Sequence, residues 1–201
     1  MFEVDQFVAD CRAAVADNDS HKAVTGIVER AVSEPDSVLK GLGEPQTGGI
    51  SKLYNGDDLT IINLECTPSL KGTMVPKTYN FRCPLEALAV TGDAGIEVAN
   101  LANNHGADFG IPALMDGVAN VAAAGIEPVG AGIDLAAATR PAIFERDGVT
   151  VAVLGFNAVN NSTAWEATET KAGMAYGDID IMVAAVQAAN AATVADVIQH
   201  C

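Results

Sequence analysis

The hydrophobic positions of this chain follow two patterns that meet near residue 50. Over residues 2–15 and again over residues 23–32, apolar side chains recur at the spacing of an amphipathic helix. Ser20 stands ahead of the second series as a suitable N-cap, and Pro35 suits the first turn of a third, shorter helix. Residues 1–49 are therefore predicted to form a small helical segment.

From residue 50 onward, short apolar runs alternate with helical patterns, which is typical of an α/β domain with a largely parallel or mixed sheet. Asp147-Gly148 predicts a hairpin turn between two of the runs. Asp134, after Gly130 and Gly132, predicts a helix N-cap rather than a dinucleotide-binding loop. Strands are predicted at residues 50–54, 59–64, 96–101, 126–130, 141–146, 149–156 and 194–198, and helices at 84–94, 111–124 and 178–194.

The composition narrows the possible function classes. The 201 residues include 11 Lys and Arg against 26 Asp and Glu, which gives a formal charge of −15. So acidic a chain lacks the basic face that binds nucleic acid, and an anionic lipid surface would repel it. Hydrophobic residues make up 49% of the chain, so we expect a packed core rather than disorder.

The sequence carries no signal for a membrane or for export. Its apolar stretches fall well short of the roughly twenty residues that a membrane-spanning helix needs. Acidic residues follow Met1 where a signal peptide would carry basic ones, so we predict a cytoplasmic protein. Thiols stay reduced in that compartment and no C-x-x-C spacing occurs. All of the cysteines are therefore predicted to be free thiols: Cys11, Cys66, Cys83 and Cys201.

Two polar segments stand at the ends of predicted strands. They are Asn63-Leu64-Glu65 and Asn103-Asn104-His105. Ligands of open α/β sheets bind outside the carboxyl ends of the strands. Carboxylate, amide and imidazole groups together suit Mn, Mg, Fe or Zn, and a His beside a metal-binding Asn can donate a proton or contact a phosphate. The alternative is that these are turn residues that satisfy nearby backbone groups, with Glu65 merely solvated.

Other chemistry has less support. No Gly-x-Ser-x-Gly elbow occurs, so a serine hydrolase is not predicted. His21 falls inside a predicted helix and is interpreted as a surface residue, and His200 lies next to the last residue of the chain. Trp165 is predicted to be a buried anchor, with a place at the rim of a site as the alternative.

Residues 58–198 resemble the CapA family of bacterial capsule-synthesis, poly-γ-glutamate proteins. The most specific feature is the combination of Asn63-Leu64-Glu65 with a later Leu101-Ala102-Asn103-Asn104-His105. The matching segments are residues 58–66 (DLTIINLEC), 77–82 (KTYNFR), 99–105 (ANLANNH), 108–110 (DFG), 124–126 (AGI), 129–132 (VGAG) and 151–156 (VAVLGF).

This resemblance implies a fold and a metal site. CapA proteins are related to the calcineurin-like metallophosphoesterases, whose fold is a β-sandwich flanked by helices, with a two-metal site at the strand ends. By this resemblance Glu65 and Asn63 are metal-site residues and Asn104 is an amide ligand. The implied cofactor is a divalent metal: Mn, Fe, Mg or Zn.

The resemblance also assigns roles around the metal. His105 would be the acid or the phosphate contact, and Asp108 would support it through a hydrogen bond. Arg82 and Asn103 would bind the substrate, an anionic small molecule or polymer. The activity implied is that of a metallophosphoesterase-like hydrolase.

The sequence also departs from the CapA pattern. The family begins with an acidic ligand in a Gly-Asp segment and ends with a His-Trp-Gly segment and a further His-containing segment, and none of these is present. The residues that match supply at most half of a two-metal ligand set. We therefore predict an incomplete, truncated calcineurin-like metallophosphoesterase sandwich over residues 50–201, weak or inactive as an enzyme.

Residues 1–64 carry a different resemblance, to the N-terminal part of cysteine dioxygenase-like cupin proteins. The matching stretches are residues 7–12, 31–32, 38–39, 42–45, 53–54 and 59–63. No His-x-His follows them, so the cupin iron site is not predicted.

Two partial resemblances in one chain suggest a chimeric junction of gene fragments. A non-enzymatic alternative is a fragment or subunit whose partner supplies the missing motifs. Its sheet would then have an exposed edge, through which we expect self-association.

Overall fold

The computed structural model describes residues 57–159, 162–193 and 196–199, with side chains up to residue 190. The predicted helical segment, the strand at 50–54 and the cupin-like stretches before residue 57 lie outside the described residues. So do His21, His200, Cys11 and Cys201.

The first sheet is parallel and holds β1 (Ile61–Asn63), β2 (Val98–Asn100) and β3 (Glu127–Val129) in that order. Parallel neighbours need crossover connections. Here α5 (Glu86–Asp93) connects β1 to β2, and α6 (Ile111–Ala123) connects β2 to β3. All three strands therefore end at the same edge of the sheet.

The second sheet has the order β5–β6–β8, with strands β5 (Ala142–Arg146), β6 (Val149–Leu154) and β8 (Asp196–Gln199). Strands β5 and β6 form the predicted hairpin. Its turn residues have positive φ, 51° at Asp147 and 79° at Gly148, which is the conformation that such two-residue turns require. Strand β8 adds to β6 in parallel.

Two helices and three short elements complete the described chain. They are α7 (Leu135–Ala138), α8 (Ile179–Thr193), β4 (Ala131–Gly132), β7 (Gly173–Met174) and the 3₁₀ turn η1 (Thr163–Trp165). Strands β4 and β7 pair antiparallel. Helix α7 begins as predicted, because the Asp134 carboxylate accepts a hydrogen bond from the backbone N–H of Ala137 at 2.7 Å.

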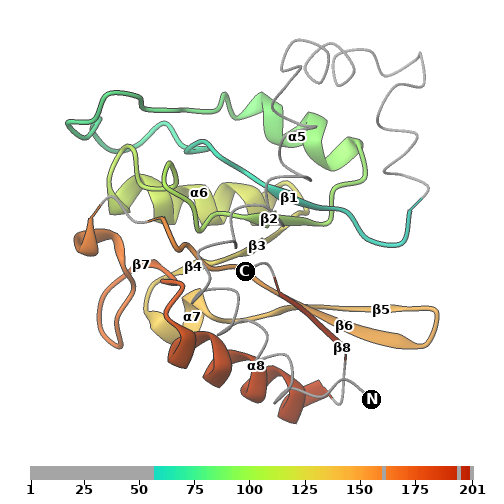
Figure 1. Ribbon diagram of the computed structural model, residues 1–201. Coiled ribbons are helices and arrows are strands. Elements are labelled where there is room, and N and C mark those ends of the chain that lie inside the picture. The colour runs from blue at the N-terminus through green and yellow to red at the C-terminus, as the bar shows by residue number, and fades with distance from the viewer. Residues whose placement is uncertain (1–56, 160–161, 194–195, 200–201) are drawn as a thin grey trace.

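The elements stack in four layers, from α5 and α6 through the two sheets to α7 and α8 (Figure 1). Successive residues of β2 show the arrangement, because their side chains point to opposite faces. Val98 packs with residues of β5 and β6 between the sheets, whereas Ala99 packs in the core under α5 and α6. On the far side, Leu154 packs in a third core with Val186 of α8. The chain is therefore a mixed α/β protein with a parallel sheet, as predicted.

The predicted strands and helices after residue 57 are all present. The hydrophobic pattern shows no sign of β4, β7 or η1, because these short elements do not extend over an apolar run of their own. Trp165, at the end of η1, is half-buried and packs against the first core.

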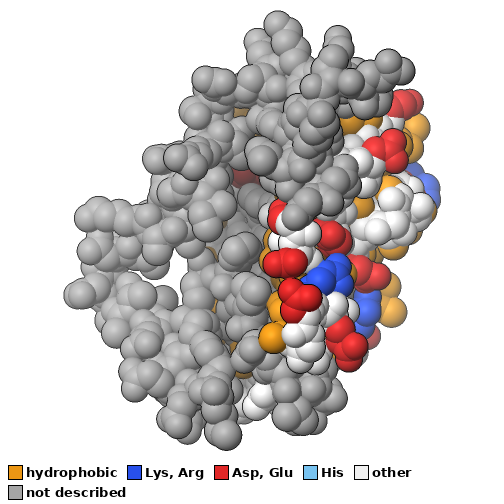
Figure 2. Space-filling model, turned by 90° about the vertical axis from the view of Figure 1, so that its right-hand side faces the viewer, with side chains coloured by type: hydrophobic (Ala, Val, Ile, Leu, Met, Phe, Trp, Pro, Cys, Tyr) orange, Lys and Arg blue, Asp and Glu red, His pale blue; other side chains and the backbone are white. Residues whose placement is uncertain are grey.

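Acidic and basic side chains lie together at the end of the molecule where the β5–β6 hairpin turns (Figure 2). At this end the Arg146 guanidinium lies 3.9 Å from a Glu97 carboxylate oxygen and donates to the carbonyl of Asp58 at 2.5 Å. None of the described helices is long and apolar enough to cross a membrane.

Candidate functional site

The carboxyl ends of strands from both sheets meet around the side chain of Asn100. A Cβ atom would lie 2.7 Å from the Asn100 amide oxygen if placed at Gly130, and 2.4 Å from it if placed at Gly155. Only glycine fits at these two positions. Gly130 follows β3 and Gly155 follows β6. The same oxygen accepts a hydrogen bond from the N–H of Ala102 at 3.0 Å, which turns the chain sharply after β2.

Polar side chains at this edge form what we call the strand-end amide group: Asn63, Glu65, Asn100 and Asn103. The Asn63 amide oxygen accepts hydrogen bonds from Asn103 Nδ2 at 3.1 Å and from Asn100 Nδ2 at 3.5 Å. Asn63 Nδ2 in turn lies 3.5 Å from a carboxylate oxygen of Glu65. The two predicted metal-site residues of the first segment are thus adjacent, at the exposed end of β1.

A second set of side chains, the His105 cluster, consists of Lys77, Phe81, His105 and Asp108. Asp108 is fully buried, and its Oδ2 lies 2.7 Å from His105 Nδ1, which is the hydrogen bond that the resemblance implied. The same oxygen accepts the backbone N–H of Phe81 at 2.7 Å, and the Phe81 ring stacks on the imidazole with centroids 4.0 Å apart. The Lys77 ammonium contacts Asp108 Oδ1 at 2.5 Å and the carbonyl oxygen of Asn104 at 2.7 Å.

The pattern of contacts favours one tautomer of the imidazole. Asp108 accepts from Phe81 and from the Lys77 ammonium, which suits an ionised carboxylate. His105 Nδ1 lies 3.1 Å from the Lys77 ammonium and closer, at 2.7 Å, to Asp108. We therefore assign the Nδ1 proton to the hydrogen bond with Asp108, which leaves Nε2 as the other ring nitrogen.

Asn103 joins the strand-end amide group to the His105 cluster. Its side-chain oxygen accepts the backbone N–H of His105 at 2.9 Å, while its Nδ2 donates to Asn63 and to the carbonyl of Leu64, each at 3.1 Å. Thr67 supports the same turn by donating to the carbonyl oxygen of His105 at 3.2 Å. Both of these side chains are buried.

Arg82 takes a different place from the other predicted site residues. Its Nη2 donates to the carbonyl of Lys71 at 2.8 Å, and its guanidinium lies 3.8 Å from the centroid of the Phe109 ring. These contacts hold Arg82 within its own loop and against the start of α6. Its predicted role toward an anionic substrate stays a prediction.

The prediction of free thiols is wrong for two cysteines, because Cys66 and Cys83 form a disulfide with Cα atoms 5.5 Å apart. Thr67 and Arg82, their inner neighbours, form a β-bridge that brings the ends of the loop together. The separation of 17 residues carries no C-x-x-C signal, and proximity arises only in the folded chain.

The loop between these cysteines is also fastened to α6. The Asp116 carboxylate contacts the Lys71 ammonium at 2.5 Å and accepts from the Ser69 hydroxyl at 2.7 Å. Hydrogen bonding from Lys71 and then from Ser69 lowers the pKa of Asp116 below its usual value. Asn120 adds a bond to the carbonyl of Pro68 at 2.9 Å.

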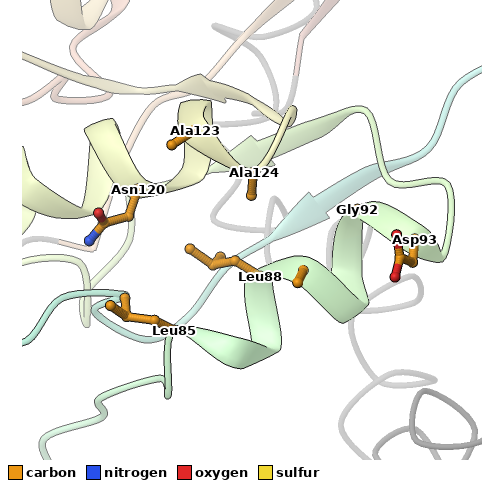
Figure 3. Close-up of a pocket in the computed structure, with 8 residues that line it drawn as sticks. Leu85, Leu88, Gly92, Asp93, Asn120, Ala123 and Ala124 are labelled. Carbon is orange, nitrogen blue, oxygen red and sulfur yellow. The ribbon is translucent and has the colours of Figure 1, made fainter.

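Two further features lie outside this network. A cavity of about 390 Å³ lies between α5 and α6, lined by Leu85, Leu88, Asn120 and small residues, with the charged Asp93 at one end (Figure 3). Asn157, two residues after Gly155, has a buried side-chain nitrogen without a hydrogen-bond partner among the described residues. Of these two features, only Asn157 follows a strand end of the kind that carries the site.

Comparison with known proteins gives one match over most of the chain. Residues 23–200 match the family model described as "Bacterial capsule synthesis protein PGA_cap". The chain belongs to this family. The match includes residues 23–56, part of the stretch with the cupin resemblance, and a separate origin for that stretch stays a prediction.

Two relatives are similar to part of the chain. A "Probable polyglutamine synthesis accessory protein" of Mycobacterium tuberculosis is 35% identical over 121 residues, which are 58% of this chain and 32% of the relative. The "PGA biosynthesis protein CapA" of Bacillus subtilis is 30% identical over 108 residues, 53% of this chain and 28% of the relative. The chain thus spans about a third of the length of these curated relatives.

One solved structure, a 5'-nucleotidase precursor from Thermus thermophilus, covers 62% of the chain, and the chain covers 28% of that protein. The sequence identity is 15% and the TM-score is 0.39.

Sequence reasoning missed part of this site. Lys77 and Phe81 stand in a segment that carries the family resemblance, yet an ammonium and a phenyl ring have no place in a metal-ligand pattern. Asn100 belongs to another such segment but is the last residue of the strand itself rather than a residue after it. The signal that could have drawn attention to Lys77 is its positive charge, since the chain has only 11 Lys and Arg residues.

The donors at the strand ends fit a hard divalent cation only in part. Glu65 offers a carboxylate, and oxygen donors suit Mg or Mn. However, the Asn63 oxygen already accepts two hydrogen bonds, and no group of three His, Cys, Asp or Glu residues gathers anywhere among the described residues. Among the described strand-end groups, Glu65 is therefore the side chain best suited to a cation, with amide oxygens beside it.

Proposed function

We propose that this chain is a metal-dependent, phosphoesterase-related component of capsule or poly-γ-glutamate biosynthesis. The observation that carries the proposal is the His105–Asp108 pair, joined through Asn103 to Glu65 and Asn63 at one edge of the sheet. Membership of the PGA_cap family supports the biological setting, and the names of the relatives agree with it.

Each residue would have a defined task in this proposal. Asp108 holds the proton on Nδ1 of His105, so that Nε2 faces a phosphoryl or leaving-group oxygen. Asn103 fixes the backbone of His105 against β1. Glu65, Asn104 and Asn63 would hold a divalent cation, which when bound supplies positive charge that polarises a phosphoryl oxygen. Asn103 and Arg82 are the proposed contacts to an anionic substrate.

A calorimetric titration with Mn²⁺ of the metal-stripped protein tests the cation site. We expect binding tighter than about 10 µM, roughly −7 kcal/mol, which is lost in Glu65→Ala. The matched control is Glu86→Ala, which removes an exposed carboxylate from the first turn of α5 and should bind as wild type does. Absence of binding by the folded wild-type chain, or equal binding by Glu65→Ala, would remove the metal from the proposal.

Turnover of a chromogenic phosphodiester in the presence of Mn²⁺ tests the reaction. We expect His105→Ala to abolish it and Glu86→Ala to leave it unchanged. Unchanged turnover in His105→Ala would remove His105 from the mechanism.

The disulfide bears on where this function takes place. Disulfides persist in oxidising compartments and are rare in the cytosol. We therefore propose an oxidising compartment in place of the cytoplasmic location that the sequence predicted. Alkylation of the protein from its native host, without reductant, should leave Cys66 and Cys83 unlabelled.

A second candidate is a non-enzymatic subunit whose partner completes the site. The single carboxylate among the described strand-end groups favours it, because one carboxylate is a poor ligand set for a two-metal hydrolase. Sedimentation over a range of concentrations would test it, since a subunit that pairs with itself changes size with concentration.

A further inference from the structure

The segment between Cys66 and Cys83 is a loop whose two ends are fastened together. Beside the disulfide, the Thr67 N–H donates to the carbonyl of Phe81 at 2.9 Å, and the Cys83 N–H donates to the carbonyl of Thr67 at 3.1 Å. Lys71 and its neighbours also hold the first third of the loop on α6 through Asp116. The second half of the loop, from Val75 to Arg82, lies against the turn that carries His105.

Three groups of this second half contact the buried acid and its histidine. The Lys77 ammonium meets Asp108 Oδ1 at 2.5 Å, and the Phe81 N–H meets Asp108 Oδ2 at 2.7 Å. The Phe81 ring covers the imidazole of His105 at 4.0 Å with the planes inclined by 22°. Asp108 thus has one oxygen held by Lys77, and the other is shared by Phe81 and His105.

These contacts restrict the imidazole in two ways. The carboxylate already accepts from Lys77 and Phe81, which favours His105 Nδ1 as a donor to it. The stacked phenyl ring blocks rotation of the imidazole out of the Asp108 plane. Asp108 belongs to the turn that carries His105, whereas the groups that fill its carboxylate and cover the imidazole come from the loop.

We infer that Lys77 and Phe81 are positioning residues for His105, and that the Cys66–Cys83 disulfide keeps them in place. The consequence for catalysis rests on the proposed function, whereas the orientation of the ring does not. A side chain that orients a group next to a metal or a substrate is worth about 10–100-fold in affinity or activity.

The orientation of the ring can be measured by NMR without any activity. The chain has 3 histidines, so long-range ¹H–¹⁵N spectra of the ¹⁵N-histidine-labelled, metal-free protein are simple, and His105→Gln assigns the signal. In wild type we expect two well-separated ring-nitrogen resonances, with the proton on Nδ1. In Lys77→Met and in Phe81→Leu we expect the two resonances to move toward an average.

Two variants serve as controls for this measurement. Lys77→Arg retains the positive charge and should retain the separated resonances. Tyr79→Leu changes an aromatic side chain of the same loop that is 69% exposed, and should leave them unchanged. Phe81 is 44% exposed, so Phe81→Leu keeps the test open if Lys77→Met does not fold. Wild-type spectra in both Phe81→Leu and a folded Lys77→Met, or equal changes in Tyr79→Leu, would overturn the inference.

Reduction tests the part played by the disulfide. A phosphine reductant breaks the S–S bond, each sulfur gains a proton, and the phosphine takes up the oxygen of a water molecule. Reduced wild type should show the averaged resonances. The double variant Cys66→Ser/Cys83→Ser should show them without reductant and should not respond to it. Separated resonances after complete reduction would overturn the role of the disulfide.

Turnover separates this inference from the proposed function. If the wild type turns over phosphodiesters, Lys77→Met and Phe81→Leu should lower kcat about 10–100-fold with little change in KM, and Lys77→Arg should restore most of it. If the wild type is inactive, the proposed function fails, while the NMR result still decides whether Lys77 and Phe81 position His105.

Discussion

The His105 cluster and the strand-end amide group lie side by side, yet they are held in different ways. The first is built around a fully buried carboxylate, with contacts of 2.5–2.7 Å and a balance of opposite charges. The second consists of amides and one carboxylate at the edge of the sheet, and two of its contacts are as long as 3.5 Å. Charged groups without solvent need their partners, whereas amides near solvent can exchange theirs for water or a ligand. The cluster is thus suited to hold a fixed orientation, and the amide group to accept a ligand.

The largest loss in the free energy of unfolding is expected when Asp108 is substituted. Asp108→Ala leaves the Lys77 ammonium and the Phe81 N–H without their acceptor, and breaking a buried ion pair from one side costs about 3–5 kcal/mol. Urea unfolding monitored by circular dichroism measures this loss. Glu65→Ala, in the amide group, should change the free energy of unfolding by less than about 0.5 kcal/mol. Similar losses for the two variants would show that the two regions are held alike.

The next largest loss in the free energy of unfolding is expected at Gly155, which packs against the strand-end amide group. In Gly155→Ala the new Cβ would lie 2.4 Å from the Asn100 oxygen and 3.1 Å from the backbone of Gly130. Overpacking of this kind costs about 1–3 kcal/mol, and contact with backbone favours the upper part of that range. The same substitution in an Asn100→Ala background should cost less, with a coupling of about 1 kcal/mol. Strict additivity in the double-mutant cycle would contradict the close approach of Asn100.

Asn103 joins the strand-end amide group to the His105 cluster, so its substitution should lower the free energy of unfolding by an intermediate amount. Asn103→Ala removes the acceptor of the His105 N–H and two donated bonds in a buried place. We expect a loss of about 2 kcal/mol in the free energy of unfolding. Asn63→Ala is the matched control, because its side chain is exposed and its bonds can be replaced by water. An equal loss in Asn63→Ala would argue against the linking role of Asn103.

The smallest effect on the free energy of unfolding is expected from Asp116, and it should depend on pH. Hydrogen bonds from Lys71 and Ser69 lower its pKa in the folded state, so the carboxylate stabilises the fold above the ordinary pKa of an aspartate. This contribution is lost as the pH falls through the lowered, folded-state pKa. Asp116→Asn should therefore be slightly less stable than wild type at pH 7, and the difference should narrow near pH 3. A difference that grows toward pH 3 would contradict the direction of the shift.

The succession of elements along the chain was easier to predict from the sequence than the site. Hydrophobic period and turn residues located the described helices and strands after residue 57, apart from β4, β7 and the 3₁₀ turn η1, because those signals are local. The family resemblance drew attention to the residues that the structure joins in one network of side-chain contacts: Asn63, Glu65, Asn103, His105 and Asp108. It also pointed to Asn104, whose carbonyl oxygen accepts from the Lys77 ammonium.

The features that sequence reasoning missed all depend on long-range geometry. The pairing of Cys66 with Cys83 follows from the bridge between their neighbours, and Lys77 meets Asp108 across 31 residues of sequence. The contact of Asn100 with two glycines requires strands of both sheets to converge. Hydrophobic period reports none of these, since it describes one element at a time.

The meeting of Asn100 with Gly130 and Gly155 also has a consequence for evolution. A side chain at either glycine would overlap the amide of Asn100. The three positions, far apart in the chain, should therefore vary together: a relative with a larger residue at 130 or 155 needs a smaller one at 100. In distant members of the family, where overall identity is low, this trio would mark the correct register of the two sheets in an alignment.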